Sequence, residues 1–495
     1  MKYGLTEKQL AEIIARISDC PEIEEAVLFG SRAMGNYKEA SDVDIAIKGE
    51  TVTAALAGKL KSDIEEDTYL PFFFDFVAYA TIANEDLKEH IDTKGVLVYR
   101  RGWRECKLGE IYSFASGLSK SRKEFGFGYN FLSFKEVFHN YFVPDKLIEL
   151  ANTTGTERSR CSIKRGDVFL TRTSETQEEL GMSCVALKDY PDATFNGFTK
   201  RLRPKNPKKV IPEFAGFYFR SPRFRAEVTS MASITTRASL NNGMLSDLTI
   251  VLPPLTEQKA IASVLSSLDD KIDLLHRQNK TLEAMAETLF RQWFVEEAKE
   301  DWKDDFLGDI ADINPTYQLK KGEIAPYLEM SNVSSSTFNP VGWTMRNFSS
   351  GMKFQNGDTL LARITPCLEN GKTCFVTFLD QYKTGWGSTE YIVIRMKQPF
   401  HPFVSYIIAK DKDFREYAIS TMSGSSGRQR AQADVIKEYE IKLPPIPIIE
   451  KLNGHLAGII QKLKRNSNQI RTLEKLRDTL LPKLMSGEVR VKYKN

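Results

Sequence analysis

The sequence predicts a multi-domain α/β protein in which a small α+β head precedes two tandem α/β globules, each followed by a long helix. Three observations support this fold class. The chain has 495 residues, enough for three or four domains at about 150 residues each. Blocks of the sequence recur at one offset, which indicates a duplication. Two segments carry the 3-4 apolar spacing of long amphipathic helices.

The composition excludes several protein classes. With 41% hydrophobic and 27% charged residues the chain is typical of globular proteins. No apolar run approaches the ~18 residues of a membrane span, and the N-terminal MKYGLTEKQL lacks the pattern of a secretory signal. The six cysteines form no CxxC pair, and no HExxH motif accompanies the five histidines. We therefore expect a cytoplasmic protein with reduced thiols, no membrane contact and no zinc hydrolase activity.

The head, residues 1–100, is acidic. It holds 11 Lys+Arg and 19 Asp+Glu, a net charge of −8, whereas the other 395 residues hold 58 and 46, a net charge of +12. This asymmetry suggests that the body meets a polyanion and that the head has another role. Charge alone does not separate this interpretation from an ordinary solvated surface.

Three aspartates of the head predict a metal site. A strand is expected to end at Phe29, Gly30 and Ser31 form a tight turn into a short helix, and a second strand carries Asp42 and Asp44. Residues two apart on a strand share a face, and adjacent carboxylates repel unless a hard cation such as Mg²⁺ lies between them. Asp75 stands alone in an apolar strand, where burial without a cation is costly. Three such acids can hold two metals over a triphosphate.

The pattern G-S-R-A-x-G-x5-S-D-x-D, followed by a strand aspartate, resembles the minimal nucleotidyltransferases of the polymerase-beta-like superfamily over residues 1–100. The resemblance implies use of Mg²⁺ and a nucleoside triphosphate, with a separate protein or a nucleic acid as the acceptor, because relatives transfer AMP to small helical partners. It assigns the triphosphate and its support to Gly30, Ser31 and Arg32, and metal binding and catalysis to Asp42, Asp44 and Asp75. A decayed head kept for protein contacts is the alternative.

An internal repeat organises residues 101–495. Four pairs of blocks align, the first at an offset of 199 and the others at 191: Trp103–Ile111 with Trp302–Ile310, Gly166–Arg172 with Gly357–Arg363, Leu252–Leu255 with Leu443–Ile446, and Thr281–Glu283 with Thr472–Glu474. Separated blocks that share one offset indicate a tandem duplication. We place the globules at 101–250 and 299–441, and the helical segments at 251–298 and 442–495.

Both helical segments carry a coiled-coil seam. The first helix is expected from about Glu257 to Trp293, and its seam positions recur in the second copy at an offset of 191. A duplicated unit that closes on itself would pair the two helices antiparallel, with Asn279 opposite Asn466 and Leu275 opposite Ile470. A buried Asn needs a polar partner and then fixes the register. Equally, one or both Asn side chains could face solvent.

The order W-x4-LGxI, GDxxLxR, LPPLxEQ, long helix, LFRQWFV and a second copy that ends in LLPKLMSGEV resembles the specificity (S) subunit of type I restriction–modification enzymes. The resemblance implies that two target-recognition domains read the halves of a bipartite, asymmetric double-stranded DNA target. It also implies that the helices act as a ruler and dock methyltransferase subunits, and through these the restriction/translocase subunits. The chain has no methyltransferase DPPY-like motif and no Walker GxxxxGK[ST] motif.

Clusters of basic residues are the candidate DNA contacts. Most would neutralise phosphates, and Arg or Gln could contact base edges. The candidates are Lys120, Arg122, Lys123, Arg158, Arg160, Arg201, Arg203, Arg237, Arg346, Arg428, Gln429 and Arg430. Arg172 and Arg363, which both copies share, are expected to support the fold or the backbone contact rather than read bases. Two alternatives remain: a nucleotidyltransferase that the body targets, and a helical scaffold that binds no DNA.

Overall fold

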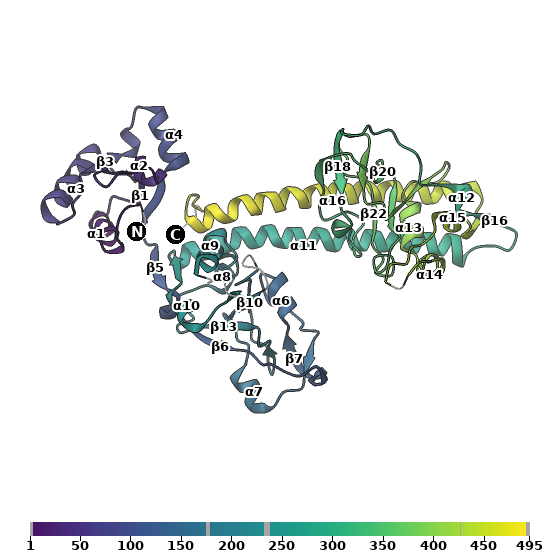
Figure 1. Ribbon diagram of the computed structural model, residues 1–495, viewed down its shortest axis with the longest axis horizontal. Helices are drawn as coiled ribbons and strands as arrows, with labels where there is room; N and C mark the ends of the chain where they lie inside the picture. Colours follow the sequence, from purple (N-terminus) through teal and green to yellow (C-terminus); the bar gives the residue numbers. More distant parts are fainter. Residues whose placement is uncertain (1–2, 175–178, 232–237, 426, 492–495) are drawn as a thin grey trace. The chain divides into compact units, whose positions relative to one another are not determined.

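The computed structural model describes residues 3–174, 179–231, 238–425 and 427–491. The chain divides into two compact units: residues 1–268 with 476–495, and residues 269–475. The first unit contains the head, the first globule and one end of each long helix. The second unit contains the second globule and the remaining helix segments (Figure 1).

A four-stranded sheet of order β3-β2-β1-β4 forms the head, with β1 antiparallel to β2 and β4, and β2 parallel to β3. Apolar side chains of the sheet and of two helices form its core, which includes Ile13, Ile17, Leu60 and Ile64. The elements are α1 Glu7–Ser18, β1 Glu25–Phe29, α2 Gly30–Met34, β2 Val43–Lys48, α3 Ala54–Asp67, β3 Phe74–Ala78, α4 Glu85–Lys94 and β4 Val96–Arg100. The head is α+β, as the sequence predicts.

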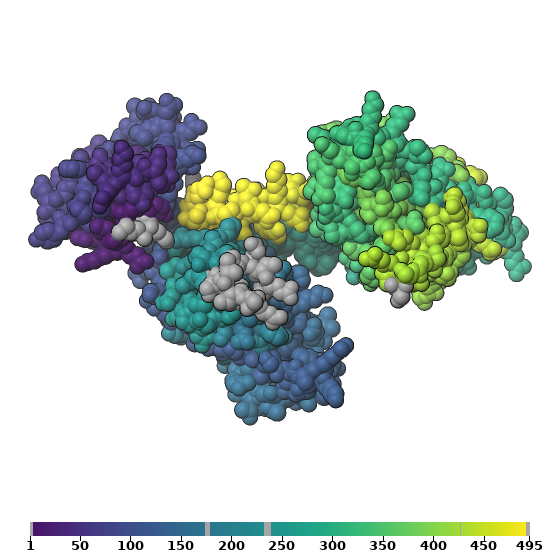
Figure 2. Space-filling view, viewed as in Figure 1, coloured from purple at the N-terminus to yellow at the C-terminus, as the bar shows by residue number. Residues whose placement is uncertain are grey.

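The first globule, blue to teal in Figure 2, contains a four-stranded sheet of order β11-β9-β13-β6, a three-stranded sheet β12-β7-β8 and the strand pair β15-β5. Another short pair joins β10 Thr173–Ser174 to β14 Ala238–Ser239. The strands of the sheets are β5 Arg104–Lys107, β6 Tyr112–Ser116, β7 Phe125–Leu132, β8 Leu150–Ala151, β9 Val168–Thr171, β11 Ser183–Val185, β12 Thr194–Phe195, β13 Thr199–Pro204 and β15 Thr249–Leu252. Its helices are α5 Leu108–Ile111, α6 Phe134–His139, α7 Gly155–Arg160, α8 Pro212–Tyr218, α9 Pro222–Met231 and α10 Asn242–Asp247.

The second globule repeats this topology. Its sheets have the orders β17-β24-β21-β22 and β19-β18-β23-β20, and β16 pairs with β25 as β5 pairs with β15. The strands are β16 Lys303–Phe306, β17 Ala311–Ile313, β18 Ile324–Leu328, β19 Thr344–Asn347, β20 Met352–Phe354, β21 Thr359–Ala362, β22 Thr373–Phe375, β23 Gly385–Gly387, β24 Tyr391–Met396 and β25 Glu440–Leu443. The helices are α12 Leu307–Ile310, α13 Val404–Lys410, α14 Lys412–Ser420 and α15 Ala433–Ile436. The duplication is therefore visible in the four-stranded sheets β11-β9-β13-β6 and β22-β21-β24-β17, whereas the second sheet has three strands in the first globule and four in the second.

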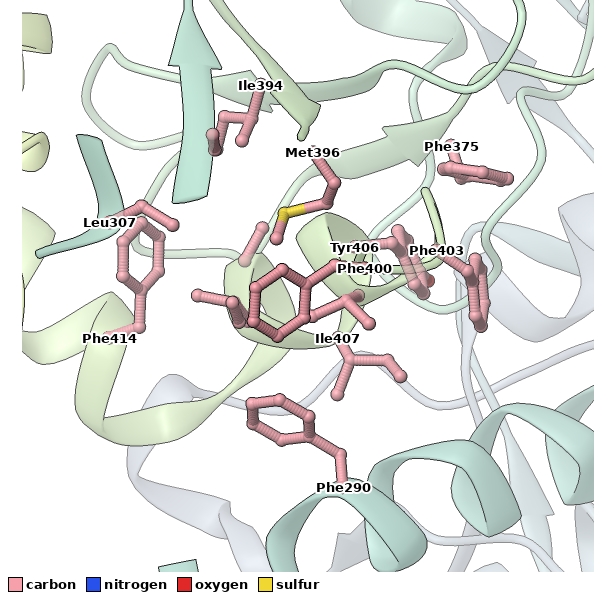
Figure 3. Close-up of a cluster of buried hydrophobic side chains, with 14 of the residues drawn as sticks. Phe290, Leu307, Phe375, Ile394, Met396, Phe400, Phe403, Tyr406, Ile407 and Phe414 are labelled. Carbon is pink, nitrogen blue, oxygen red and sulfur yellow. The ribbon is translucent and has the colours of Figure 1, made fainter. Parts of the chain in front are cut away.

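Aromatic and aliphatic side chains fix the second globule to the helices of its own unit. Phe290 of the first long helix lies in the same buried cluster as Phe400, Phe403 and Ile407 of the globule (Figure 3). A fully buried side chain of this size contributes about 1.5–3 kcal/mol. Hydrophobic burial thus joins the globule to its helix without a separate linker.

The two long helices are α11 Leu255–Arg291, which ends in a π-helical turn Gln292–Glu296, and α16 Ile446–Ser486. In the second unit Asn466 Nδ2 donates to Asn279 Oδ1 at 2.9 Å, and Leu275 and Ile470 share one buried cluster. In the first unit Leu265 packs in the same core as Leu481. These contacts match the expected pairing of Asn279 with Asn466 and of Leu275 with Ile470, and neither Asn faces solvent.

Two further expectations concern membranes and thiols. In the parts of the chain that the structure describes, no helix combines the length and the hydropathy needed to cross a bilayer. All six cysteines are free thiols.

Candidate functional site

The start of α2, directly after β1 ends at Phe29, approaches the acidic strand closely. Gly30 adopts φ +69°, and a Cβ at this position would overlap the carboxylate oxygen Oδ2 of Asp44. Phe29, the last residue of β1, pairs with Asp44 across the sheet. Only glycine combines this left-handed backbone with this close approach. The sequence Phe-Gly-Ser therefore places the backbone of Gly30 and the half-buried Ser31 directly beside Asp44.

The three predicted acids lie at the same edge of the sheet. Asp44 on β2 is in register with Asp75 on the parallel strand β3, and Asp42 lies just before β2, which begins at Val43. Burial, then the negative charges of Asp75 and Asp42, raise the pKa of Asp44 above its usual value. A bound cation would reverse this effect, because it favours the charged carboxylate.

The expectation that Asp75 is buried in its apolar strand is wrong. Asp75 is exposed, because β3 turns alternate side chains outward and Phe74 and Phe76 take the buried positions. The register opposite Asp44 is what connects Asp75 with the site. Among the described residues, no group of three or more His, Cys, Asp or Glu side chains has the geometry of a metal site. The donor chemistry suits a hard cation, and the exposed Asp42 and Asp75 would have to turn toward Asp44 to complete it.

Arg32 does not lie where a nucleotide would contact it. Its side chain is only 1% exposed, and its guanidinium donates to the backbone carbonyls of Tyr3, Ser41 and Asp42. The guanidinium also lies 4.6 Å from the ring centroid of Phe72. Arg32 therefore fixes the chain immediately before β2, and its support for the site is indirect.

Two predicted basic segments of the first globule meet at the strand β7. Lys120 Nζ lies 2.9 Å from Glu157 and 3.2 Å from Glu124, which ties the segment before β7 to α7. The guanidinium of Arg158 stacks 3.7 Å from the ring centroid of Tyr129 on β7. Arg122, Lys123 and Arg160 are exposed around these contacts. Segments that are separated by more than 30 residues of sequence thus form one basic, aromatic surface.

Two other predicted contacts of this globule are structural. Arg203 Nη2 lies 2.6 Å from the fully buried Asp167, and in the second copy Arg395 Nε lies 2.5 Å from the fully buried Asp358. Both aspartates also accept a hydrogen bond from the backbone of the preceding turn. Arg201 is 8% exposed, and its guanidinium donates to the carbonyls of Arg160 and Ser162. The fold therefore uses the guanidinium groups of both Arg201 and Arg203, and their assignment to DNA stays a prediction.

Arg395 is the counterpart of Arg203 in the second copy. This repetition could have indicated from the sequence that the two arginines are structural. Arg172 and Arg363 make matching backbone bonds: Arg172 O accepts from Leu240 N at 2.9 Å, and Arg363 O accepts from Ala431 N at 2.8 Å. These bonds connect equivalent segments of the two globules but do not involve the guanidinium groups, whose role stays a prediction.

Two of the predicted DNA contacts of the second globule, Arg346 and Arg430, form ion pairs. Arg430 makes a bidentate contact with Glu390, with Nη2 to Oε1 at 2.8 Å, which raises the pKa of Arg430 and occupies its guanidinium. Arg346 pairs with Glu329 at 2.5 Å on exposed β19. Arg428 is exposed and Gln429 is half-buried on the loop between Ser423 and Arg430. Arg237 lies outside the described residues.

Sequence reasoning missed the exposed aromatic side chains Phe127 and Tyr129 on β7. The signal was present as the alternation Phe-Gly-Phe-Gly-Tyr from residue 125, since glycine inside a strand often marks a bulge.

Comparison with known proteins agrees with this architecture. The family "Type I restriction modification DNA specificity domain" matches residues 100–284 and 299–477, one match for each globule with its helix. The family "Polymerase beta, Nucleotidyltransferase" matches residues 11–102, which is the head.

Individual relatives cover the body of the chain. The type I restriction enzyme MjaIX specificity subunit of Methanocaldococcus jannaschii is 24% identical over 417 residues, 78% of this chain and 92% of the relative. The HindI specificity subunit of Haemophilus influenzae is 22% identical over 471 residues, 78% of this chain and 99% of the relative. A crystal structure of the S subunit of a type I system from M. genitalium aligns with a TM-score of 0.47 and 16% identity, over 77% of this chain and 96% of that chain. Because the two family matches to the body span most of its length, the protein belongs to the type I restriction modification DNA specificity family and carries an N-terminal polymerase beta-type nucleotidyltransferase domain.

Proposed function

We propose that this protein recognises a bipartite, asymmetric DNA target as the specificity subunit of a type I restriction–modification complex. The observation that carries the proposal is that the two globules share buried ion pairs but differ in their exposed side chains. The buried pairs Asp167–Arg203 and Asp358–Arg395 recur in both globules. The exposed side chains differ: the first globule presents Phe127 and Tyr129 on β7, whereas the second presents Met345 and Arg346 on β19. Two such surfaces would contact two different base sequences.

The helices α11 and α16 serve in this proposal as a coiled-coil spacer and as the dock for methyltransferase subunits, through which the restriction/translocase subunits join. The antiparallel pairing and the buried Asn279–Asn466 contact support a fixed register. A fixed register is what a spacer between two half-sites requires, as in dimeric DNA-binding proteins.

Footprinting of the complex reconstituted with the methyltransferase subunits tests this part. We expect two protected stretches separated by an unprotected spacer, and an affinity that falls steeply as salt rises. A single continuous stretch, or binding that is insensitive to salt, would contradict the proposal.

In the same proposal the head is a Mg²⁺-dependent nucleotidyltransferase. Asp42, Asp44 and Asp75 would hold the metal, which would neutralise the triphosphate charge and stabilise the charge that develops on transfer. The close approach of Gly30 to Asp44 supports this reading, because it leaves the backbone of residues 30–31 beside the carboxylate and open to a phosphate. The raised pKa of Asp44 supports it as well, since uncompensated negative charge is concentrated there.

Incubation of the full-length protein with Mg²⁺ and labelled nucleoside triphosphates, with and without a lysate as acceptor source, tests the head. We expect label transfer that EDTA abolishes and that Asp44→Asn reduces at least 100-fold. Equal labelling by wild type and Asp44→Asn would contradict the assignment of this site.

A further inference from the structure

The strand β7 of the first globule contains a bulge built from two glycines. Gly126 and Gly128 adopt φ values of +94° and +96°, and the ladder to β8 shifts register between Phe125 and Tyr129, which both lie opposite Ala151. A Cβ on Gly128 would lie 2.6 Å from the carbonyl oxygen of Ala151. β-Bulges of this kind re-aim a side chain, and here the residue between the glycines is Phe127.

The bulge turns Phe127 away from the core. Phe127 is 52% exposed and Tyr129 is 40% exposed, whereas Phe131 on the same strand is 1% exposed. Phe125 packs edge-on against Phe131, with ring centroids 5.2 Å apart. The strand is thus anchored at both ends, and the rings of Phe127 and Tyr129 between the anchors are presented to solvent, Phe127 the more so.

The charge around the ring identifies the class of ligand. Arg122 and Lys123 lie in the turn before β7 and are exposed, and Arg160 is exposed at the end of α7. Glu124 and Glu157 lie among these cations and both pair with Lys120. Arg158 stacks on the ring of Tyr129 and pairs with Asp192 at 3.2 Å. A protruding apolar ring within a positively charged surface complements a polyanion with a flat apolar interior. Duplex DNA has these properties, and an apolar protein groove would not require the cations.

We propose that Phe127 is a wedge that enters between two stacked base pairs of the half-site bound by the first globule. The ring would partly unstack the step, while Arg122, Lys123 and Arg160 hold the flanking phosphates and Tyr129 with Arg158 supports the ring from the side. Such insertion is favoured at pyrimidine–purine steps, which unstack easily. The wedge would therefore add sequence preference without a hydrogen bond to a base. This inference rests on the proposed DNA recognition.

The test uses the full-length protein and the duplex that footprinting identifies, with 2-aminopurine placed in turn at each position of the protected half-site. For wild type we expect a several-fold rise in fluorescence at one step. Phe127→Ala should abolish that rise and weaken binding roughly 10- to 100-fold, in the range of one lost aromatic–base stack, with an unchanged dependence on salt. Phe127→Trp should retain both the rise and the affinity. Tyr69→Ala, which removes an exposed ring from the head, is the control and should bind as wild type.

Three outcomes would overturn the wedge: no fluorescence rise at any step with wild type, wild-type affinity of Phe127→Ala, or loss of methyltransferase-subunit association by Phe127→Ala with DNA binding intact. The last outcome would make the ring part of a protein dock. Failure of the proposed function has a different signature, namely the absence of any sequence-specific footprint with wild-type protein. Circular dichroism melting of each variant confirms that the globule remains folded.

Discussion

At the scale of single residues, the head depends on one glycine and one buried arginine. Only glycine at position 30 fits beside the Asp44 carboxylate without a clash. The guanidinium of Arg32 donates to the backbone carbonyls of Ser41 and Asp42, which lead into β2. Neither residue would supply a ligand through its side chain. Both determine where the acidic side chains lie, and substitutions that leave every carboxylate in place should still damage the site.

Gly30→Ala tests this dependence, and Gly35→Ala is its matched control. Both glycines adopt a left-handed φ, +69° and +77°, so each alanine costs about 1–2 kcal/mol of backbone strain. Only the Cβ at position 30 meets Asp44, since nothing lies within 4 Å of one at position 35. We expect similar losses of thermal stability, but loss of Mg²⁺-dependent nucleotide binding in Gly30→Ala alone, measured by titration calorimetry. Equal binding by both variants would contradict the role of Gly30.

At the scale of elements, the helix pair combines an apolar seam with two polar positions. Asn279 is 5% and Asn466 is 1% exposed, next to the cluster of Ile272, Leu275 and Ile470. One helix turn further along, Glu283 is 7% exposed and accepts a hydrogen bond from the hydroxyl of Tyr406 at 2.8 Å. Buried polar groups at a seam cost stability but select one alignment.

The Asn pair can be measured with a double-mutant cycle. Asn279→Leu or Asn466→Leu alone leaves one buried amide without its partner, and each should destabilise the second unit by about 1–3 kcal/mol. The double Leu variant removes both amides, so it should lose less stability than the sum of the single variants. Urea unfolding of wild type, the two single variants and the double variant gives the coupling free energy between the two Asn side chains. Additive losses would mean that the two amides do not depend on each other.

Glu283 gives the second unit a pH-dependent stability. Burial raises the pKa of Glu283 from 4.5 to about 7 in the folded protein, although the Tyr406 hydroxyl and Lys410 oppose the shift. As pH rises from 4.5 to about 7, the unfolded chain releases this proton first, so the contribution of Glu283 to stability falls across that window and is constant above it. Glu283→Gln stays neutral and should therefore gain stability over wild type, by about 1.4 kcal/mol for each unit of pKa shift.

Thermal unfolding of Glu283→Gln at pH 5 and pH 8 measures this gain, which should be larger at pH 8. Glu416→Gln, on an exposed position of α14, is the control and should differ little from wild type at either pH. An equal gain at the two pH values would show that titration of Glu283 is not its cause.

At the scale of the whole molecule, two proposed activities share one chain: nucleotidyl transfer by the head and DNA recognition by the body. The head has its own buried core, separate from the core of the first globule, and it carries a net charge of −8 on a body of +12. The acidic head would repel a DNA duplex, whereas the basic body would attract it. The two proposed activities should therefore be separable by mutation.

A pair of double variants tests this separation. Asp42→Ala with Asp44→Ala should abolish Mg²⁺-dependent transfer and leave sequence-specific methylation by the reconstituted complex within about twofold of wild type. Arg122→Ala with Lys123→Ala should leave transfer intact and weaken DNA binding, with the slope of log K against log salt reduced by about 0.9 per lost phosphate contact. Loss of methylation in the aspartate variant would mean that the head takes part in DNA recognition.

The sequence by itself determined the duplication, the helix register and the acids at one sheet edge, because repeats, heptads and strand alternation are read from spacing along the chain. It predicted that Asn279 would meet Asn466, and the hydrogen bond between them is present. Tertiary structure decided which charges remain available. Arg203 pairs with Asp167 and Arg430 with Glu390, both about 40 residues away in sequence. It also exposed Asp75 and turned Phe127 outward. Exposure and ion pairing depend on which distant segments meet, so spacing along the chain gives indirect signals, such as the Phe-Gly-Phe-Gly-Tyr alternation, but does not specify the contacts themselves.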